Sequence, residues 1–407
     1  MTEVSQLLLT NGLVKSALEN SSGNKNITVN NIKFSKGCSG GDNYCSEIIR
    51  AKVDFSDGNG DYKECSLIIK CIQKSPQNDI LVEMGVFDRE KFMFLEFFPR
   101  MERILQKEFS PKFYLTSCEP VKTFIMDDLN FSGYKLGDRV CGLDLEHSKF
   151  VMENLGEFHA GSLVFIEKYP EIANQADSPP MFPKKAEDLN EVHSNMFGKT
   201  FETFISVVSE NPKFENISKK LRNMTDSFLK TVVETYDNSE DKIKVINHGD
   251  FWVNNIMFKY NEGRPVGLKF IDFQFSYFAS PGIDINYFLL ISCQPEVLKT
   301  NRDELILTYY NSLVKTLHTL EFSKIPSLDD ILQEIRLKEF YGFMALTTLL
   351  PILSMESKTS ADNCLENIGS DGKQNQIFHG RRFQEMFEFC LNRFDELGLF
   401  EDIKMIR

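Results

Sequence analysis

Two carboxylates and one amide follow short apolar stretches of the chain between residues 245 and 274. Asp250 follows the stretch Val-Ile-Asn, Asn255 comes five residues later, and Asp272 directly follows the stretch Leu-Lys-Phe-Ile. A turn at residues 261–264 predicts a hairpin that brings Asp272 back opposite the other two side chains. Phosphoryl transfer needs one carboxylate beside the acceptor hydroxyl, and an amide oxygen with a second carboxylate to hold magnesium against the nucleotide phosphates. The spacing therefore predicts a phosphotransfer centre.

The same residue types would also suit ordinary turns and caps, where Asp and Asn are common. The chemical interpretation is favoured because His248 and Gly249 directly precede Asp250 and a strand is predicted before each cluster. We group His248 with the catalytic residues as the side chain that orients the loop, rather than as a general base. Trp252, the only tryptophan, either lines an acceptor pocket or packs the loop.

A lysine lies on an apolar strand in the first third of the chain. Lys70 ends the stretch Leu-Ile-Ile-Lys, and a buried charge without a partner would be costly. A carboxylate from the following helical segment is therefore expected beside it. Glu90 is the preferred candidate, and Glu83 and Glu96 are the alternatives.

The elements expected to position these side chains fall into two groups, as the length of 407 residues favours. Alternating apolar residues and turn-formers predict an antiparallel sheet of at least three strands over residues 27–72, with a hairpin at 56–61. A helix over 79–105, interrupted at Pro99, and strand character over 113–129 follow. Beyond a boundary near residues 127–133, helices dominate around the short β-rich island at 245–273. The expected helices cover residues 143–167, 196–209, 217–236, 302–320 and 328–355.

Composition narrows the partners and the compartment. The formal charge of −13 and the pI of about 5.1 disfavour a nucleic-acid backbone or an anionic membrane surface as a main partner. Nine cysteines without a repeated CxxC spacing indicate free thiols in a reducing compartment. The first residues lack a signal-peptide pattern, and no apolar stretch reaches the ~20 residues that span a bilayer. We therefore expect a cytoplasmic protein.

The order His248, Asp250 and Asn255, followed by Asp272 on an apolar strand, resembles the motif of the protein-kinase-like superfamily in the form seen in aminoglycoside and choline phosphotransferases. The longer strings HGDFWVNN and IDFQ resemble more particularly the insect ecdysteroid kinase-like family, also called CHK kinase-like. This resemblance implies a two-lobed α+β protein-kinase-like fold that uses ATP and Mg²⁺. It also implies that Asp250 is the catalytic base and that Asn255 and Asp272 are the magnesium ligands.

The resemblance extends to further parts of a nucleotide site. The stretch at residues 36–44 resembles the family's phosphate-covering loop, although on spacing alone it also suits a hairpin turn. Residues 124–129 resemble the hinge whose backbone would hold the adenine. Asp284 resembles an acid that braces the catalytic loop, and an ordinary acid at a helix start is the alternative. The nucleotide-binding candidates are thus Lys70, Glu90, Gly40, Gly41, Asn43, Met126, Asp127 and Asp128.

These expectations combine into one hypothesis. Residues 1–127 would form a nucleotide-binding lobe, residues 128–132 a hinge, and residues 133–407 a catalytic and substrate-binding lobe, with ATP between the lobes. The resemblance implies transfer of the γ-phosphate to an alcohol of an ecdysteroid or a similar hydrophobic metabolite or xenobiotic. A choline, ethanolamine or aminoglycoside kinase is the nearest rival, and it would need an aromatic cage or an acidic rim. A catalytically inactive, nucleotide-binding pseudokinase is the rival of another class, against which the intact motif residues argue.

Overall fold

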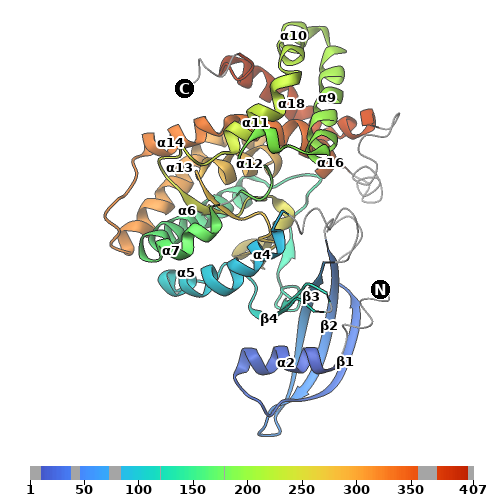
Figure 1. The fold of residues 1–407 in the computed structure, drawn as a ribbon, viewed down its shortest axis with the longest axis vertical. Coiled ribbons are helices and arrows are strands. Elements are labelled where there is room, and N and C mark those ends of the chain that lie inside the picture. Colours follow the sequence, from blue (N-terminus) through green and yellow to red (C-terminus); the bar gives the residue numbers. More distant parts are fainter. Residues whose placement is uncertain are drawn as a thin grey trace.

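The computed structural model describes residues 11–37, 46–72, 84–119, 121–177, 179–355 and 374–401. A β-sheet with one helix against it forms one end of the molecule, and most of the helices form the other end (Figure 1). The strands are β1 (Thr28–Lys36), β2 (Glu47–Ser56), β3 (Tyr62–Cys71), β4 (Phe113–Ser117), β5 (Thr123–Asp127), β6 (Lys135–Leu136), β7 (Val245–Asn247), β8 (Ile256–Asn261), β9 (Arg264–Phe270) and β10 (Tyr277–Ala279). The α-helices are α2 (Asn11–Ser22), α4 (Val86–Phe92), α5 (Phe98–Leu105), α6 (Leu145–Lys168), α7 (Pro170–Ala173), α8 (Glu191–His193), α9 (Lys199–Ser209), α10 (Glu215–Asn223), α11 (Phe228–Tyr236), α12 (Gly282–Ile291), α13 (Pro295–Thr319), α14 (Leu328–Leu337), α15 (Glu339–Met344), α16 (Leu350–Leu353) and α18 (Arg381–Glu396).

The large sheet is antiparallel, with the strand order β1-β2-β3-β5-β4. The predicted hairpin is confirmed, because β2 and β3 pair without a register shift from Ser56 opposite Tyr62 to Glu47 opposite Cys71. One face of the sheet buries its apolar residues against α2, which contributes Val14 to this smaller core. The sheet and α2 thus share a hydrophobic core of their own.

The helical segment after the sheet joins it to the larger part of the molecule. Helices α4 and α5 are joined by a π-helical turn at Met93–Phe97, so the helix runs on where an interruption at Pro99 was expected. Pro99 lies in the first turn of α5, where a missing N–H is tolerated. The Phe97 ring packs edge-on against Phe165 of α6, with ring centroids 5.0 Å apart. This segment therefore belongs to the large core.

The helical part follows the predicted pattern at its long helices and departs from it at two places. Helix α6 matches the expected element, α13 begins at Pro295 rather than at the expected residue 302, and the two helices pack along each other. The stretch expected as one helix over 217–236 is split into α10 and α11. The stretch over 328–355 is split into α14, α15 and α16, with a π-helical turn at Ala345–Leu349.

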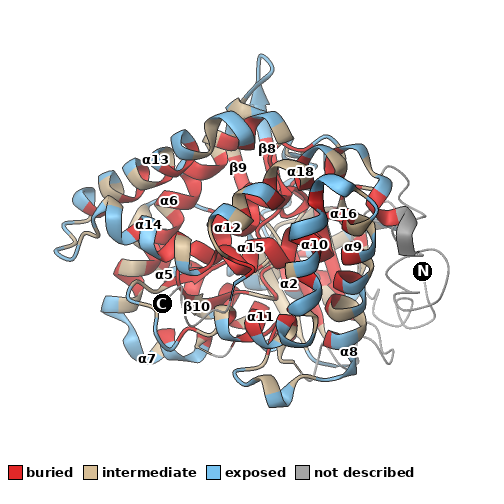
Figure 2. Ribbon diagram, turned by 90° about the horizontal axis from the view of Figure 1, so that it is seen from above, coloured by how far each residue is buried: buried red, intermediate tan, exposed pale blue. Residues whose placement is uncertain are grey.

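Two small sheets build the predicted β-rich island. Strands β8 and β9 form the expected hairpin, and β6 pairs with β8. Strand β7 pairs with β10 instead, so the residues after β7 and those after β9 leave two different sheets. All ten residues of α12, which follows β10, are buried, and Figure 2 shows this helix as part of the buried centre of the molecule.

Helix α12 packs closely against α14 and α15, and each of these two contacts contains a glycine. A Cβ atom on Gly282 would lie 2.4 Å from the carbonyl oxygen of Glu334 in α14, and one on Gly342 of α15 would lie 2.4 Å from Leu290 of α12. Real Cβ atoms do not approach a main-chain oxygen that closely, so only glycine permits this spacing at position 282, whereas at position 342 the end of the Leu290 side chain would have to shift.

Two further expectations concern membranes and thiols. Within the part of the chain that the structure describes, no helix is long and apolar enough to cross a membrane. The described cysteines are all free thiols, at positions 65, 71, 118, 141, 293 and 390.

Candidate active site

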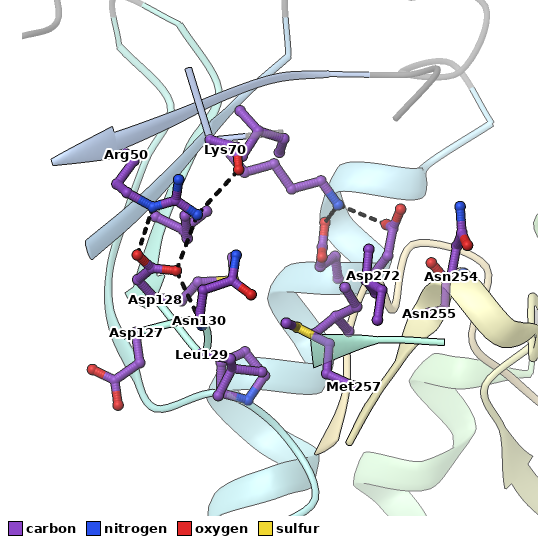
Figure 3. Close-up of a pocket in the computed structure, with 18 residues that line it drawn as sticks. Arg50, Lys70, Asp127, Asp128, Leu129, Asn130, Asn254, Asn255, Met257 and Asp272 are labelled. Carbon is purple, nitrogen blue, oxygen red and sulfur yellow. Dashed lines mark hydrogen bonds and ion pairs between the residues drawn. The ribbon is translucent and has the colours of Figure 1, made fainter. Parts of the chain in front are cut away.

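A cavity opens between the large sheet and the helical part, and seven of the predicted site residues line it (Figure 3). Its apolar walls come from Ile48 and Ile68 of the sheet and from Met257 and Ile271 of the island. Charged and amide side chains gather at two ends of it, with Arg50, Asp127, Asp128 and Asn130 at one end and Lys70, Asn254, Asn255 and Asp272 at the other (Figure 3). The polar lining consists of Arg50, Lys70, Glu90, Asp127, Asp128, Asn130, Asn254, Asn255 and Asp272.

Lys70 joins the sheet to both of the other elements at this end. Its Nζ lies 2.7 Å from Glu90 Oε2 on α4 and 2.7 Å from Asp272 Oδ1 after β9. The predicted pairing with Glu90 is thus present, and Glu96 instead pairs with Arg100. Burial lowers the pKa of Lys70, but the carboxylates of Asp272 and Glu90 outweigh burial and raise it above its ordinary value. The ammonium therefore stays charged.

Asp272 adopts a backbone conformation that side chains rarely accept. Its φ is +67°, in the left-handed region that non-glycine residues seldom occupy. Such strain persists only where surrounding contacts hold it, and it is concentrated at functional sites. Such contacts are present at the preceding residue, because Ile271 donates its N–H to the carbonyl of Asn255 and accepts from the His248 ring.

The loop that carries Asp250 is shaped by Gly249 and held by Asp284. Gly249 has a φ of +82°, and a Cβ there would lie 1.9 Å from the carbonyl oxygen of Phe275. Asp284, fully buried on α12, accepts from the N–H of His248 at 2.7 Å and from that of Gly249 at 2.9 Å. These are the contacts of a brace, as the resemblance implied for Asp284.

His248 links the two segments through its ring. Nε2 lies 2.9 Å from the carbonyl oxygen of Ile271, and Nδ1 lies 3.3 Å from the backbone nitrogen of Asp250. Because a carbonyl only accepts, Nε2 carries the proton and Nδ1 accepts from the Asp250 N–H. Both ring nitrogens are engaged by backbone, which supports the orienting interpretation.

The Asp250 carboxylate is held at both oxygens. Asn255 Nδ2 donates to Oδ2 at 2.8 Å, and the Tyr287 hydroxyl donates to Oδ1 at 2.8 Å. Burial raises the pKa of Asp250 above its ordinary value, and the bond from Tyr287 opposes this. Tyr287 was not predicted from the sequence. The available signal was its position three residues after Asp284 on one helix, a spacing that puts both side chains on the same face.

The oxygens that remain free suit a magnesium ion. Among the described contacts, Asn255 uses its Nδ2 on Asp250 and leaves Oδ1 without a hydrogen bond, and Asp272 uses Oδ1 on Lys70 and leaves Oδ2 without one. Oxygen ligands are what Mg²⁺ prefers, commonly one or two from protein with the rest from phosphates and water. Over the described ranges, no group of three or more His, Cys, Asp or Glu side chains could hold a metal. The residues fit an ion that phosphates help to bind.

The predicted hinge residues line the cavity, yet the carboxylates of Asp127 and Asp128 already accept hydrogen bonds from other side chains of the protein. Asp128 accepts from Arg50 Nε at 2.6 Å and from the Ser66 hydroxyl at 2.8 Å, and Asp127 accepts from the Tyr114 hydroxyl at 2.7 Å. Arg50 was also missed from the sequence, although a charge on the apolar strand β2 was a usable signal. Met126 contributes to the cavity wall.

The structure places Trp252 away from the cavity and does not describe four further candidates. Trp252 is buried in the large core and does not line the cavity, which supports its packing interpretation. Asn254, not predicted, is buried and lines the cavity beside Asn255. Four candidates lie outside the described residues, namely Gly40, Gly41, Asn43 and Glu83.

The large antiparallel sheet lies next to a mostly helical part, with the cavity between them. This arrangement is the two-lobed protein-kinase-like fold, so the predicted fold class is confirmed. The model of the ecdysteroid kinase-like family matches residues 40–322. The chain therefore belongs to this family, as its motifs predicted. No match was found among the curated proteins.

Several solved structures are similar over most of the chain at low identity. A Plasmodium vivax ethanolamine kinase is 13% identical with a TM-score of 0.39, over 91% of this chain and 85% of that one. A glucosamine kinase with glucosamine, ADP and inorganic phosphate is 11% identical with a TM-score of 0.35, over 84% and 94%. The GDP complex of an aminoglycoside 2'-phosphotransferase is 13% identical with a TM-score of 0.36, over 82% and 99%.

Proposed function

We propose that this protein is an ATP- and magnesium-dependent small-molecule kinase that phosphorylates an alcohol hydroxyl. The observation that carries the proposal is the meeting of Lys70, Asn255 and Asp272 at one end of a cavity, with Asp250 bonded to Asn255 behind them. These side chains come from distant parts of the sequence, and together they supply the groups that phosphoryl transfer requires.

The nucleotide is proposed to lie in the cavity between a lobe of residues 1–127 and a lobe of residues 133–407, with residues 128–132 as the hinge. The apolar walls formed by Ile48, Ile68, Met257 and Ile271 suit a flat base. Because the Asp127 and Asp128 carboxylates are occupied, the base would use backbone groups there. The phosphates would then reach the Lys70 ammonium.

Asn255 Oδ1 and Asp272 Oδ2 are the protein oxygens proposed to hold magnesium. When bound, the ion neutralises negative charge on the phosphates. The acceptor hydroxyl donates a hydrogen bond to the Asp250 carboxylate, which orients its oxygen in line with the γ-phosphorus. A new oxygen–phosphorus bond forms while the bond to the bridging oxygen of ADP breaks. The hydroxyl proton passes to Asp250 and from there to solvent, and ADP leaves.

The acceptor is proposed to be an ecdysteroid or a related hydrophobic alcohol. The support is membership of a family that is described as ecdysteroid kinase-like. Choline, ethanolamine and aminoglycosides are therefore included in the test as competing acceptors.

The test is incubation with Mg-ATP and a panel of ecdysteroids, xenobiotic alcohols, choline, ethanolamine and aminoglycosides, read by mass for an added phosphate. We expect a phosphorylated ecdysteroid or apolar alcohol. The control Asp250→Asn should keep ATP binding and lose transfer, because the amide cannot accept the proton. Transfer to choline or an aminoglycoside would reassign the acceptor. ATP binding without any transfer would replace the kinase proposal by a pseudokinase role.

A further inference from the structure

Tyr287 lies at the back of the site, on the side of Asp250 that faces the core. It belongs to the fully buried helix α12, and 2% of its surface is exposed. It does not line the cavity. Its hydroxyl oxygen is 2.8 Å from Asp250 Oδ1, and its ring stacks on that of Tyr341, with centroids 5.8 Å apart at an angle of 25°.

The direction of this hydrogen bond follows from the surroundings of the phenol. Burial, together with the charge of Asp250, raises the pKa of Tyr287 well above its ordinary value. The phenol therefore keeps its proton, and it donates to the carboxylate. A hydrogen bond to a charged acceptor is stronger than one between neutral groups.

The two oxygens of the Asp250 carboxylate have different donors. Asn255 Nδ2 takes Oδ2, and Tyr287 takes Oδ1. Two donors on two different oxygens fix both the position and the plane of a carboxylate. The same helix holds the backbone of this loop through Asp284, which accepts from His248 and Gly249. Helix α12 thus holds both the main chain of this loop and the side chain of Asp250 in place.

We propose that Tyr287 is a positioning residue for phosphoryl transfer, whose hydroxyl locks the plane of the Asp250 carboxylate so that its remaining lone pairs meet the acceptor hydroxyl. The inference rests on the proposed kinase function, since it assigns Asp250 the role of base. It predicts that the Tyr287 oxygen matters for turnover and not for nucleotide binding.

Tyr341 provides a matched control for the test. Tyr341 is also buried, and its ring stacks on the ring of Tyr287. Its hydroxyl, however, lies 3.8 Å from the sulfur of Met181 and does not contact Asp250. Tyr287→Phe and Tyr341→Phe each remove one buried hydroxyl and keep the ring, so a general effect of losing a phenol would appear in both.

The experiment measures steady-state turnover of Mg-ATP by the full chain, both to water as phosphate release and to any acceptor from the panel. Values of kcat are expressed per ATP-binding site, titrated for each variant, so that misfolded protein does not count. We expect Tyr287→Phe to lower kcat about 10- to 100-fold, the range for loss of a hydrogen bond to a charged group. KM for ATP should stay within about twofold, because Tyr287 does not line the cavity proposed to hold the nucleotide and its hydroxyl contacts Asp250. Tyr341→Phe should keep the wild-type kcat.

Each other outcome is decisive. A wild-type kcat in Tyr287→Phe, a change in KM alone, or an equal loss in Tyr341→Phe overturns the positioning role while the turnover of the wild type leaves the kinase function standing. A wild-type protein that binds ATP but transfers phosphate to neither water nor any acceptor overturns the kinase function, and the inference with it.

Discussion

His248 Nε2 lies 2.9 Å from the carbonyl oxygen of Ile271, which ties the loop carrying Asp250 directly to the strand end carrying Asp272. The two segments leave different small sheets, so this ring contact helps to set the distance between the two carboxylates. Substitutions of His248 should therefore affect both.

His248→Ala removes this bond, leaves a buried carbonyl without a donor and opens a cavity. We expect it to lower the free energy of unfolding by about 2–4 kcal/mol, measured by urea denaturation. The control is His318→Ala, an exposed histidine on α13, which should change stability by less than about 0.5 kcal/mol. Equal stability of the two variants would show that the ring does not hold the segments together.

Lys70→Met should destabilise the fold because it leaves the Glu90 carboxylate buried without its partner. The expected loss is about 3–5 kcal/mol, and adding Glu90→Gln should restore part of it, since the second change removes the uncompensated charge. The exposed pair of Lys184 with Asp177, 3.2 Å apart, gives the control: Lys184→Met should cost less than about 1 kcal/mol. If the double variant is no more stable than Lys70→Met, the buried pair is not the cause.

Gly249→Ala tests the turn before Asp250. The added methyl would meet the Phe275 carbonyl at 1.9 Å and would also force a positive φ on alanine. We expect a loss of at least about 3 kcal/mol of unfolding free energy, or insoluble protein on expression. Gly133 separates the two causes, because its φ is +86° and a methyl group added there would meet nothing within 4 Å. Gly133→Ala should cost only about 1 kcal/mol, and similar losses at both positions would contradict a clash at Gly249.

The stability of the protein should fall as the solution becomes mildly acidic. Burial lowers the pKa of His159 below its ordinary value in spite of Asp284, and burial also lowers the pKa of His193. The folded protein therefore holds both rings neutral, while the unfolded chain binds protons near pH ~6.5. The stability they contribute is complete above that pH and is lost as the pH falls through and below it.

Urea unfolding between pH ~7.5 and ~5.5 measures this slope. Replacing either buried ring, as in His193→Gln, should make the slope shallower, whereas the exposed His318→Ala should leave it unchanged. A stability that rises toward acid would mean that His159 and Asp284, 3.4 Å apart, form a charged pair.

The predictions from the sequence were most accurate for contacts that are determined by the local sequence pattern or by the cost of burying a charge. Asp250, Asn255 and Asp272 follow short apolar strands, and a lysine inside the sheet required a carboxylate, which is Glu90. Tyr287 was not predicted because its partner lies 37 residues away and comes from a loop. No periodicity in α12 reports that contact.

The helix boundaries that were predicted wrongly have a similar cause. The apolar pattern over 328–355 continues through Lys338, where the structure separates α14 from α15. The buried Lys338 side chain donates to the carbonyls of Thr235 and Asp237 and pairs with Asp241 at 2.7 Å. Partners about 100 residues earlier in the chain thus accompany the break, and a local pattern does not contain them.

The close contacts of α12 with α14 and α15 have a consequence for how this protein tolerates change. Gly282 and Gly342 lie outside the cavity, yet their close contacts help to determine the position of the helix that carries Asp284 and Tyr287. A larger residue at Gly282 would push the helix away from the main chain of α14, and the loop bearing Asp250 would move with it, whereas one at Gly342 would first displace the end of the Leu290 side chain. The geometry proposed for phosphoryl transfer thus depends on close helix packing outside the cavity, so we expect substitutions at the buried positions around α12 to lower turnover.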